Sequence, residues 1–246
     1  NFKKYFSKKR HIVAVVVIFL LTGCQVFRIF IFGGKTTYRN LPFEQNNPQA
    51  DLKILFLGDS TAVGTGAENN TESTAGWFGQ EFPEAHITNI SRNGQRLAGL
   101  LKNFPAMDTP YTLVILQIGA NDIMRFTPLK NVERDLSILI DKAKRIGRTV
   151  VILHSGNVGT APIFSWPFSE LLTARTRALR DLYIKTTREK DVLYVYLFQE
   201  RKDDVFLTDI EKFYASDLFH PSAEGYRVWY EKIRKVLNES GVSLVN

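Results

Sequence analysis

From residue 51 onward, short apolar runs alternate with longer segments in which apolar residues recur at helical spacing. The apolar runs are predicted strands at 53–57, 86–91, 113–116, 149–153 and 192–196. Short helices are predicted within 71–84 and 97–104, and longer helices at 129–146, 169–190 and 222–238. Strands that are separated by helices pair in parallel, and the helices cover both faces of the sheet. The pattern therefore predicts an α/β fold of three layers.

The N-terminal residues have a different pattern, in which basic residues precede an apolar segment at 12–21. The basic residues are Lys3, Lys4, Lys8, Lys9 and Arg10. A basic stretch, an apolar stretch and small residues are typical of a secretory signal. The following Leu-Thr-Gly-Cys resembles the lipobox of bacterial lipoproteins. This resemblance implies that residues 1–23 are removed and that Cys24 is lipidated.

The segment after Cys24 leaves a second interpretation open. Residues 26–32 are again mostly apolar, so that 12–32 together have about the length of a membrane-spanning helix. Arg28 would then lie in or near the bilayer, where an arginine costs about 2.5 kcal/mol or more near the centre. With either anchor the basic end stays inside, and the domain is expected outside the cytoplasm, anchored to a membrane of the bacterial cell envelope.

The rest of the chain is predicted to form a tether and one domain. Residues 24–50 include Gly-Gly and Asn-Asn-Pro and are predicted to be a tether or a surface loop. Residues 51–246 are long enough to form one α/β domain with its own core. The single cysteine excludes an internal disulfide.

The net charge of +7 comes mostly from the N-terminus, because removing the five basic residues before Cys24 leaves +2. A charge this small gives little support for nucleic-acid binding. No nucleic-acid partner is therefore predicted.

Four short motifs each follow a predicted strand or precede the last helix. They are Gly58-Asp59-Ser60, Asn93-Gly94, Gly119-Ala120-Asn121-Asp122 and Asp217-Leu218-Phe219-His220. Taken singly, each would serve as a turn or a helix cap. The carboxyl ends of parallel strands meet at one edge of a sheet, so the four motifs are expected to lie together there.

The residue types in these motifs suit nucleophilic catalysis. A serine hydroxyl needs a base, and the base needs an orienting partner. Asp217 and His220 are three residues apart, so a turn can bring the carboxylate to the imidazole, and Ser60 is then the nucleophile. The oxyanion of the tetrahedral intermediate needs preorganised donors. The candidates are the backbone N–H groups of Ser60 and Gly94 and the side-chain amide of Asn121.

Together these residues resemble the SGNH (GDSL) hydrolase family. Its four named positions are matched in order by Ser60, Gly94, Asn121 and His220, over about residues 51–240. The resemblance implies a flavodoxin-like α/β/α sandwich with a parallel sheet of about five strands. It also implies that carboxylic esters are hydrolysed through an acyl-serine intermediate, without a metal or another cofactor. Thr61-Ala62 replaces the commoner leucine-rich continuation, which leaves the subfamily open.

Three alternatives remain open. An α/β-hydrolase has the same order of serine, aspartate and histidine, but Ala62 stands where its Gly-x-Ser-x-Gly elbow has the last glycine. The same triad can transfer an acyl group to a sugar or remove acetyl groups from envelope glycans. A non-catalytic surface lipoprotein with this fold is the third alternative, and the complete set of four residues argues against it.

The substrate is expected to be a small-molecule, lipid or glycan ester, such as a short-chain ester, a lysophospholipid or an acetylated envelope glycan. Three residues near the motifs are candidate substrate-binding residues: Asp59 beside Ser60, His154 at the end of the fourth strand, and Arg125, which suits an anionic or acylated group. The sequence does not indicate an oligomeric state.

Overall fold

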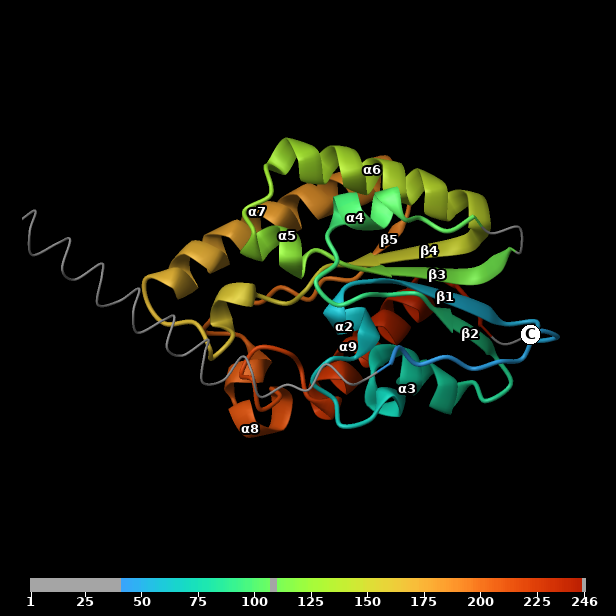
Figure 1. Cartoon of the computed structure of the whole chain (residues 1–246), viewed down its shortest axis with the longest axis horizontal. Helices are drawn as coiled ribbons and strands as arrows, with labels where there is room; N and C mark the ends of the chain where they lie inside the picture. Colours follow the sequence, from blue (N-terminus) through green and yellow to red (C-terminus); the bar gives the residue numbers. More distant parts are fainter. Residues whose placement is uncertain (1–40, 107–109, 245–246) are drawn as a thin grey trace, which may run out of the picture.

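Five parallel strands form the centre of the fold, in the order β2-β1-β3-β4-β5 (Figure 1). Their bounds are β1 Lys53–Gly58, β2 His86–Asn89, β3 Tyr111–Gln117, β4 Gly147–Leu153 and β5 Leu193–Tyr194. Every neighbouring pair is parallel. The predicted flavodoxin-like sheet is therefore confirmed.

This computed structural model describes residues 41–106 and 110–244. The predicted signal peptide at 1–23, Cys24 and the alternative membrane helix at 12–32 lie outside the described residues. Within the described ranges, no helix is both long and apolar enough to cross a membrane.

Helices cover both faces of the sheet and complete the three layers (Figure 1). One face packs against α4 Leu97–Lys102, α5 Ala120–Met124, α6 Leu129–Ile146 and α7 Phe168–Glu189. The other face packs against α3 Thr74–Glu81 and α9 Ala223–Glu239, with the short α8 Ile210–Phe213 beyond them. The predicted α/β/α sandwich is confirmed.

Alternate residues of each strand enter opposite cores, because side chains of a strand alternate between its two faces. In β1, Ile54 and Phe56 belong to the core under α3 and α9, whereas Leu55 and Leu57 belong to the core under α6 and α7. All four side chains are fully buried. A sheet covered on both faces explains why its strands are continuous apolar runs in the sequence.

The structure differs from the predicted elements mainly at short segments. The predicted strand at 192–196 is reduced to the two residues of β5, which pair with Val151 and Ile152 near the end of β4. Gly147 both caps α6 and begins β4, so no loop separates them. The helices α2 Ser60–Val63 and α8 have four residues each, too few to show helical periodicity.

The described part of the predicted tether, residues 41–50, is attached to the domain. Gln45 forms an antiparallel bridge with Ile87, with N···O distances of 3.0 and 2.9 Å. Its side-chain amide also donates to the carbonyls of Phe82 and Ala85. This part of the tether is therefore a docked surface loop.

Candidate active site

The first motif forms a strand-to-helix turn in which Asp59 caps α2. Oδ1 of Asp59 accepts the backbone N–H of Thr61 at 2.9 Å and its hydroxyl at 2.8 Å, and Oδ2 accepts the N–H of Gly119 at 3.3 Å. A Cβ atom on Gly58 would lie 2.1 Å from the carbonyl oxygen of Gln117, so only glycine fits there. The turn therefore holds Ser60 at the carboxyl edge of the sheet.

The structure places Asp59, a predicted substrate-binding residue, away from the cavity. Its side chain is buried, it does not line the cavity beside Ser60, and its carboxylate is occupied by Thr61 and Gly119. Burial raises the pKa of Asp59, and the hydrogen bonds from Thr61 and Gly119 act in the opposite direction. Asp59 therefore positions the serine turn.

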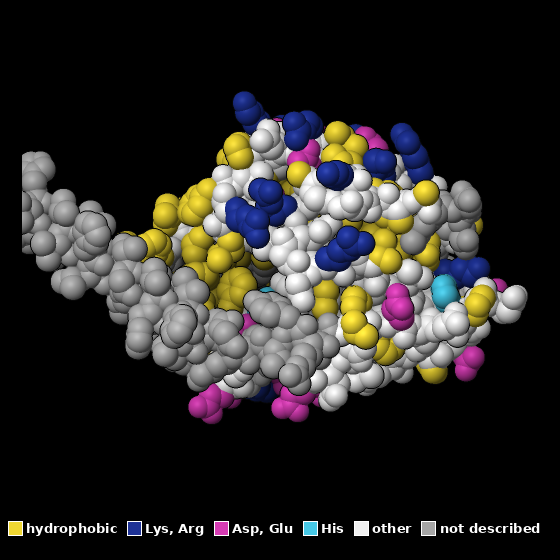
Figure 2. Space-filling view, in the orientation of Figure 1, with side chains coloured by type: hydrophobic (Ala, Val, Ile, Leu, Met, Phe, Trp, Pro, Cys, Tyr) yellow, Lys and Arg dark blue, Asp and Glu magenta, His cyan; other side chains and the backbone are white. Residues whose placement is uncertain are grey.

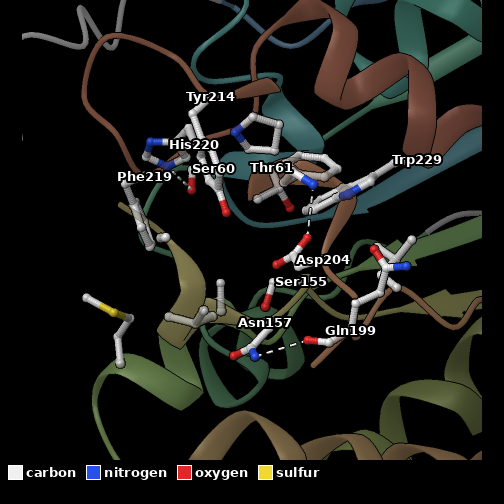
Figure 3. Close-up of a pocket in the computed structure, with 18 of the residues that line it drawn as sticks. Ser60, Thr61, Ser155, Asn157, Gln199, Asp204, Tyr214, Phe219, His220 and Trp229 are labelled. Atoms are coloured by element: carbon white, nitrogen blue, oxygen red, sulfur yellow. Dashed lines mark hydrogen bonds between the residues drawn. The ribbon is translucent and has the colours of Figure 1, made fainter. Parts of the chain in front are cut away.

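The histidine and aspartate of the last motif complete a triad with Ser60. Nε2 of His220 lies 2.9 Å from Oγ of Ser60 (Figure 3). Nδ1 of the same ring lies 2.6 Å from Oδ2 of Asp217. All three side chains are buried, with exposed fractions of 6% for Ser60, 4% for His220 and 2% for Asp217. This arrangement can transfer a proton from the serine to the imidazole while the carboxylate orients the ring.

The turn that carries Asp217 and His220 is fixed by its own backbone. Ala215 donates its N–H to the carbonyl of His220 at 2.9 Å, and Tyr214 forms an antiparallel bridge with Pro221. Leu218 adopts a left-handed conformation, with φ of 59°. The short α8 on one side and α9 on the other therefore hold the predicted triad residues in place.

Gly94 lies at the same edge of the sheet, in the turn after β2. Two contacts join this turn to the serine turn: Arg92 N–H donates to the carbonyl of Gly58 at 3.1 Å, and the Thr65 hydroxyl donates to Oδ1 of Asn93 at 2.7 Å. A Cβ atom on Gly94 would meet no described atom within 4 Å. Room for a side chain is therefore present, and glycine is suited to this position by its left-handed φ of 72°.

Asn121 lies in the first turn of α5 and lines a cavity together with Ser60 and His220. The next residue, Asp122, is buried and accepts the N–H of Leu97 at the start of α4, at 3.0 Å. Burial raises the pKa of Asp122, and the bond from Leu97 opposes this effect. Asp122 thus connects α5, which carries Asn121, to the segment after Gly94. This positioning role is not evident from the sequence.

The two other predicted substrate-binding residues are not at the cavity. His154 is buried between Tyr183 and Tyr194, with ring-centroid distances of 5.3 and 6.1 Å, and burial lowers its pKa to about 4. Arg125 is exposed and caps the end of α5 through its backbone. Neither residue lines the cavity, and the structure gives no contact that supports a role for them in substrate binding.

The cavity beside the triad has a volume of about 100 Å³ (Figure 3). Residues that follow β4 and β5 and residues of α9 line it. Its apolar lining includes Leu197, Phe206, Tyr214 and Trp229. Its polar lining, beyond the triad and Asn121, includes Ser155, Asn157, Gln199, Asp204 and Lys232. None of these residues was predicted, because each looks like an ordinary core or surface position in the sequence.

An exposed apolar surface lies at one end of the face shown in Figure 2, over α5 and the first turns of α7. Large exposed side chains on or next to these helices are Phe126 after α5, Leu129 at the start of α6, Trp166 before α7 and Leu171 within α7. Such a surface can contact the apolar part of a substrate or partner.

The sequence profile of the GDSL-like lipase/acylhydrolase family matches residues 56–228, more than half of the chain. The matched range includes Ser60, Gly94, Asn121, Asp217 and His220. No curated protein matches the chain.

Several solved structures have the same fold. A member of the lipolytic G-D-S-L family from Veillonella parvula is 18% identical, with a TM-score of 0.61 over 76% of this chain and 98% of that chain. TesA is 18% identical, with a TM-score of 0.60 over 78% and 99% of the two chains. Axe2, an acetylxylan esterase from Geobacillus stearothermophilus, is 19% identical, with a TM-score of 0.54 over 82% and 99%.

At these identities the structural likeness shows the fold, and the family is shown by the sequence profile. The strand order, the four motifs at one edge of the sheet and the match over residues 56–228 agree with one another. The chain belongs to the GDSL-like lipase/acylhydrolase family.

Proposed function

We propose that this protein is a serine esterase that hydrolyses carboxylic esters through an acyl-serine intermediate. The observation that carries the proposal is the hydrogen-bonded series Asp217–His220–Ser60, with distances of 2.6 and 2.9 Å, beside a cavity. Membership of the GDSL-like family supports ester hydrolysis. The intact geometry argues against a non-catalytic lipoprotein with the same fold.

In the first half of the reaction, Nε2 of His220 accepts the proton of the Ser60 hydroxyl while Oγ attacks the ester carbonyl carbon. The carbonyl π electrons move to the oxygen, which becomes an oxyanion. We assign its stabilisation to the N–H groups of Ser60 and Gly94 and the amide of Asn121. The carboxylate of Asp217 stabilises the imidazolium that forms on His220.

The intermediate then collapses and the alcohol leaves. The bond between the carbonyl carbon and the alcohol oxygen breaks, and His220 donates its proton to that oxygen. In the second half, His220 takes a proton from water, the hydroxyl adds to the acyl carbon, and the bond to Ser60 breaks. The proton returns to Ser60, and the carboxylic acid is released as the carboxylate.

We also propose that the esterase acts outside the cytoplasm, attached to a membrane of the cell envelope. The support is the basic and apolar N-terminus followed by a lipobox-like sequence at Cys24. The exposed apolar surface beside α5 and α7 supports a location next to lipid or acylated material. The nearest esters there are envelope lipids and acylated glycans.

The test of the esterase uses p-nitrophenyl esters of increasing acyl length and a fluorophosphonate probe. Wild-type protein should hydrolyse at least the short esters, and mass spectrometry should find one adduct, on Ser60. Ser60→Ala should lose turnover by several orders of magnitude and remain folded by circular dichroism. An adduct on another residue, or full turnover in Ser60→Ala, would show that the assignment is wrong.

A further inference from the structure

The side of the catalytic cavity that faces the triad carries both hydrogen-bond donors and hydrogen-bond acceptors. Figure 3 shows Asp204 and Ser155 across the cavity from Ser60 and His220, with Trp229 beside them. Lys232, one turn further along α9 than Trp229, also lines the cavity. The chemical character of these groups indicates what they can bind.

Ser155 supplies a hydroxyl that has no hydrogen-bond partner within the described part of the chain. The residue follows β4 and is 9% exposed, and its Oγ has no hydrogen-bond partner among the described residues. A hydroxyl can both donate and accept. At the wall of a cavity, a buried hydroxyl without a protein partner is available to a ligand or an ordered water.

Asp204 supplies acceptors only. Its Oδ2 accepts the hydroxyl of Thr160 at 2.6 Å, and its Oδ1 accepts the N–H of Phe206 at 3.1 Å. These two bonds fix the carboxylate at the cavity wall, where the residue is 9% exposed. Each carboxylate oxygen has a second lone pair, so both can accept a donor from a bound molecule.

Lys232 supplies donors only. The residue is partly buried, and among the described residues its ammonium group makes neither a hydrogen bond nor an ion pair. Burial lowers the pKa of Lys232, and the negative charge of Asp204 acts in the opposite direction. An ammonium group in this position can donate to an acceptor on a ligand.

Few ligand chemistries match this combination. A long alkyl chain would offer no hydrogen bond to Ser155 or Lys232, and none to the remaining lone pairs of Asp204, which is costly for buried groups. An anion would be attracted by Lys232 but repelled by Asp204. A cation would be attracted by Asp204 but repelled by Lys232. A neutral group with several hydroxyls can donate to Asp204, accept from Lys232 and do either with Ser155.

The shape of the cavity agrees with a hydroxylated ring. Trp229 gives one wall a flat apolar surface, against which the C–H groups of a sugar ring can pack. The volume of about 100 Å³ is smaller than the roughly 150 Å³ of a cavity that encloses benzene. The cavity is open to solvent, so it can receive the hydroxylated edge of a ring while the rest of the molecule lies outside.

We propose that Ser155, Asp204, Lys232 and Trp229 form a saccharide-binding subsite, so that the substrates are acylated sugars. The inference rests on the proposed esterase function, because the subsite adjoins the triad and would hold the sugar whose ester oxygen is released. It narrows the substrate class from esters in general to O-acylated saccharides.

The test compares two acetates with rings of the same size. One is a mono-O-acetyl methyl pyranoside, and the other is cyclohexyl acetate, which lacks the ring hydroxyls. The wild-type kcat/KM should be at least about tenfold higher for the sugar ester, because several hydrogen bonds are made only by this substrate. A wild-type ratio near one, or a clear preference for octanoyl over acetyl esters, would overturn the proposal.

Substitutions of Lys232 and Ser155 test whether the preference for the sugar ester arises from the proposed subsite. Lys232→Met should reduce the ratio of the two kcat/KM values by about tenfold or more, and Ser155→Ala should reduce it several-fold. The matched control is Lys235→Met, because Lys235 lies on the same helix but is exposed, 3.7 Å from Glu239. This control should leave the ratio unchanged. If the ratio in Lys232→Met and Ser155→Ala equals the wild-type ratio, the subsite is wrong.

Fluorophosphonate labelling of Ser60 distinguishes a failure of the proposed saccharide subsite from a failure of the proposed esterase activity. Labelling and turnover of p-nitrophenyl acetate, without a preference for the sugar ester, would overturn the subsite and leave the esterase intact. Absence of both labelling and turnover would overturn the esterase and the subsite together. Thermal unfolding of each variant shows whether a changed ratio comes from a folded protein.

Discussion

Asp217 holds His220 by its ring and by its backbone at the same time. Oδ2 of the carboxylate lies 2.6 Å from Nδ1 of the ring, and Oδ1 accepts the backbone N–H of His220 at 2.9 Å. One side chain thus sets both the position of the residue and the direction in which Nε2 points. The 2.9 Å contact between His220 and Ser60 depends on this arrangement.

Replacing Asp217 by asparagine should therefore leave the fold intact and remove the orientation of the ring. An amide at this position favours the wrong tautomer of His220, so kcat should fall by about 10³–10⁴-fold. Steady-state kinetics on p-nitrophenyl acetate measure this change. Asp209→Asn is the matched control, because Asp209 is an exposed cap of α8. Near-wild-type turnover in Asp217→Asn would contradict the assigned role.

Asn121→Ala tests the assigned oxyanion site. The lost donor acts mainly in the transition state, so kcat should fall by about 10²–10³-fold with little change in KM. An exposed asparagine at the end of α4 provides the control, and Asn103→Ala should retain wild-type kinetics. A change in KM alone would mean that Asn121 binds the ground-state substrate instead.

His154 should make stability fall at acidic pH. Its pKa is about 4 in the folded protein and 6.5 when unperturbed. Above pH 6.5 the ring is neutral in both states. As the pH falls from 6.5 to 4, the unfolded chain binds a proton that the folded protein does not, so the free energy of unfolding decreases by up to about 1.4 kcal/mol per pH unit.

Urea unfolding of wild type and His154→Gln at pH 7 and pH 5 measures this effect. Between these two values the wild type should lose about 2 kcal/mol more than the variant, which has no titrating group at this position. The comparison uses the difference between the two pH values, so the cost of the substitution itself cancels. Equal losses in the two proteins would show that the buried histidine does not resist protonation.

The proposed lipid anchor depends on Cys24. Cys24→Ser should block both processing and incorporation of a fatty-acid probe, and a larger precursor should accumulate. Several acyl chains together give firm attachment, whereas one chain gives only marginal binding. A variant of wild-type size that remains in the membrane, with no probe incorporated into wild type, would favour the uncleaved helix at 12–32.

The sequence was sufficient to predict the sheet and the motifs that lie at its edge. Strands buried on both faces appear as apolar runs, which made β1 and β3 predictable. The helix predicted at 129–146 has the same bounds in the structure, because apolar residues recur along its whole length. The parallel topology then placed the motifs together, since each motif follows a strand or precedes α9.

The cavity was not predictable, because its walls depend on which face of the sheet each residue meets. Leu153 belongs to the core under α9, and Ser155, two residues later, lies on the same side and lines the cavity. His154 lies between them and points to the opposite layer, against Tyr183. The sequence placed His154 at the correct edge but did not reveal that the cavity lies on the α9 side.

The contact between Ser60 and His220 also constrains when the enzyme becomes active during its synthesis. The two residues are 160 positions apart, and a second buried bond, from the Tyr226 hydroxyl to the carbonyl of Thr65, spans 161 positions. The ribosome therefore produces the nucleophile 160 residues before its base. A nascent chain that has not yet reached Asp217 has Ser60 without a partner, so ester cleavage begins only when α9 closes the domain.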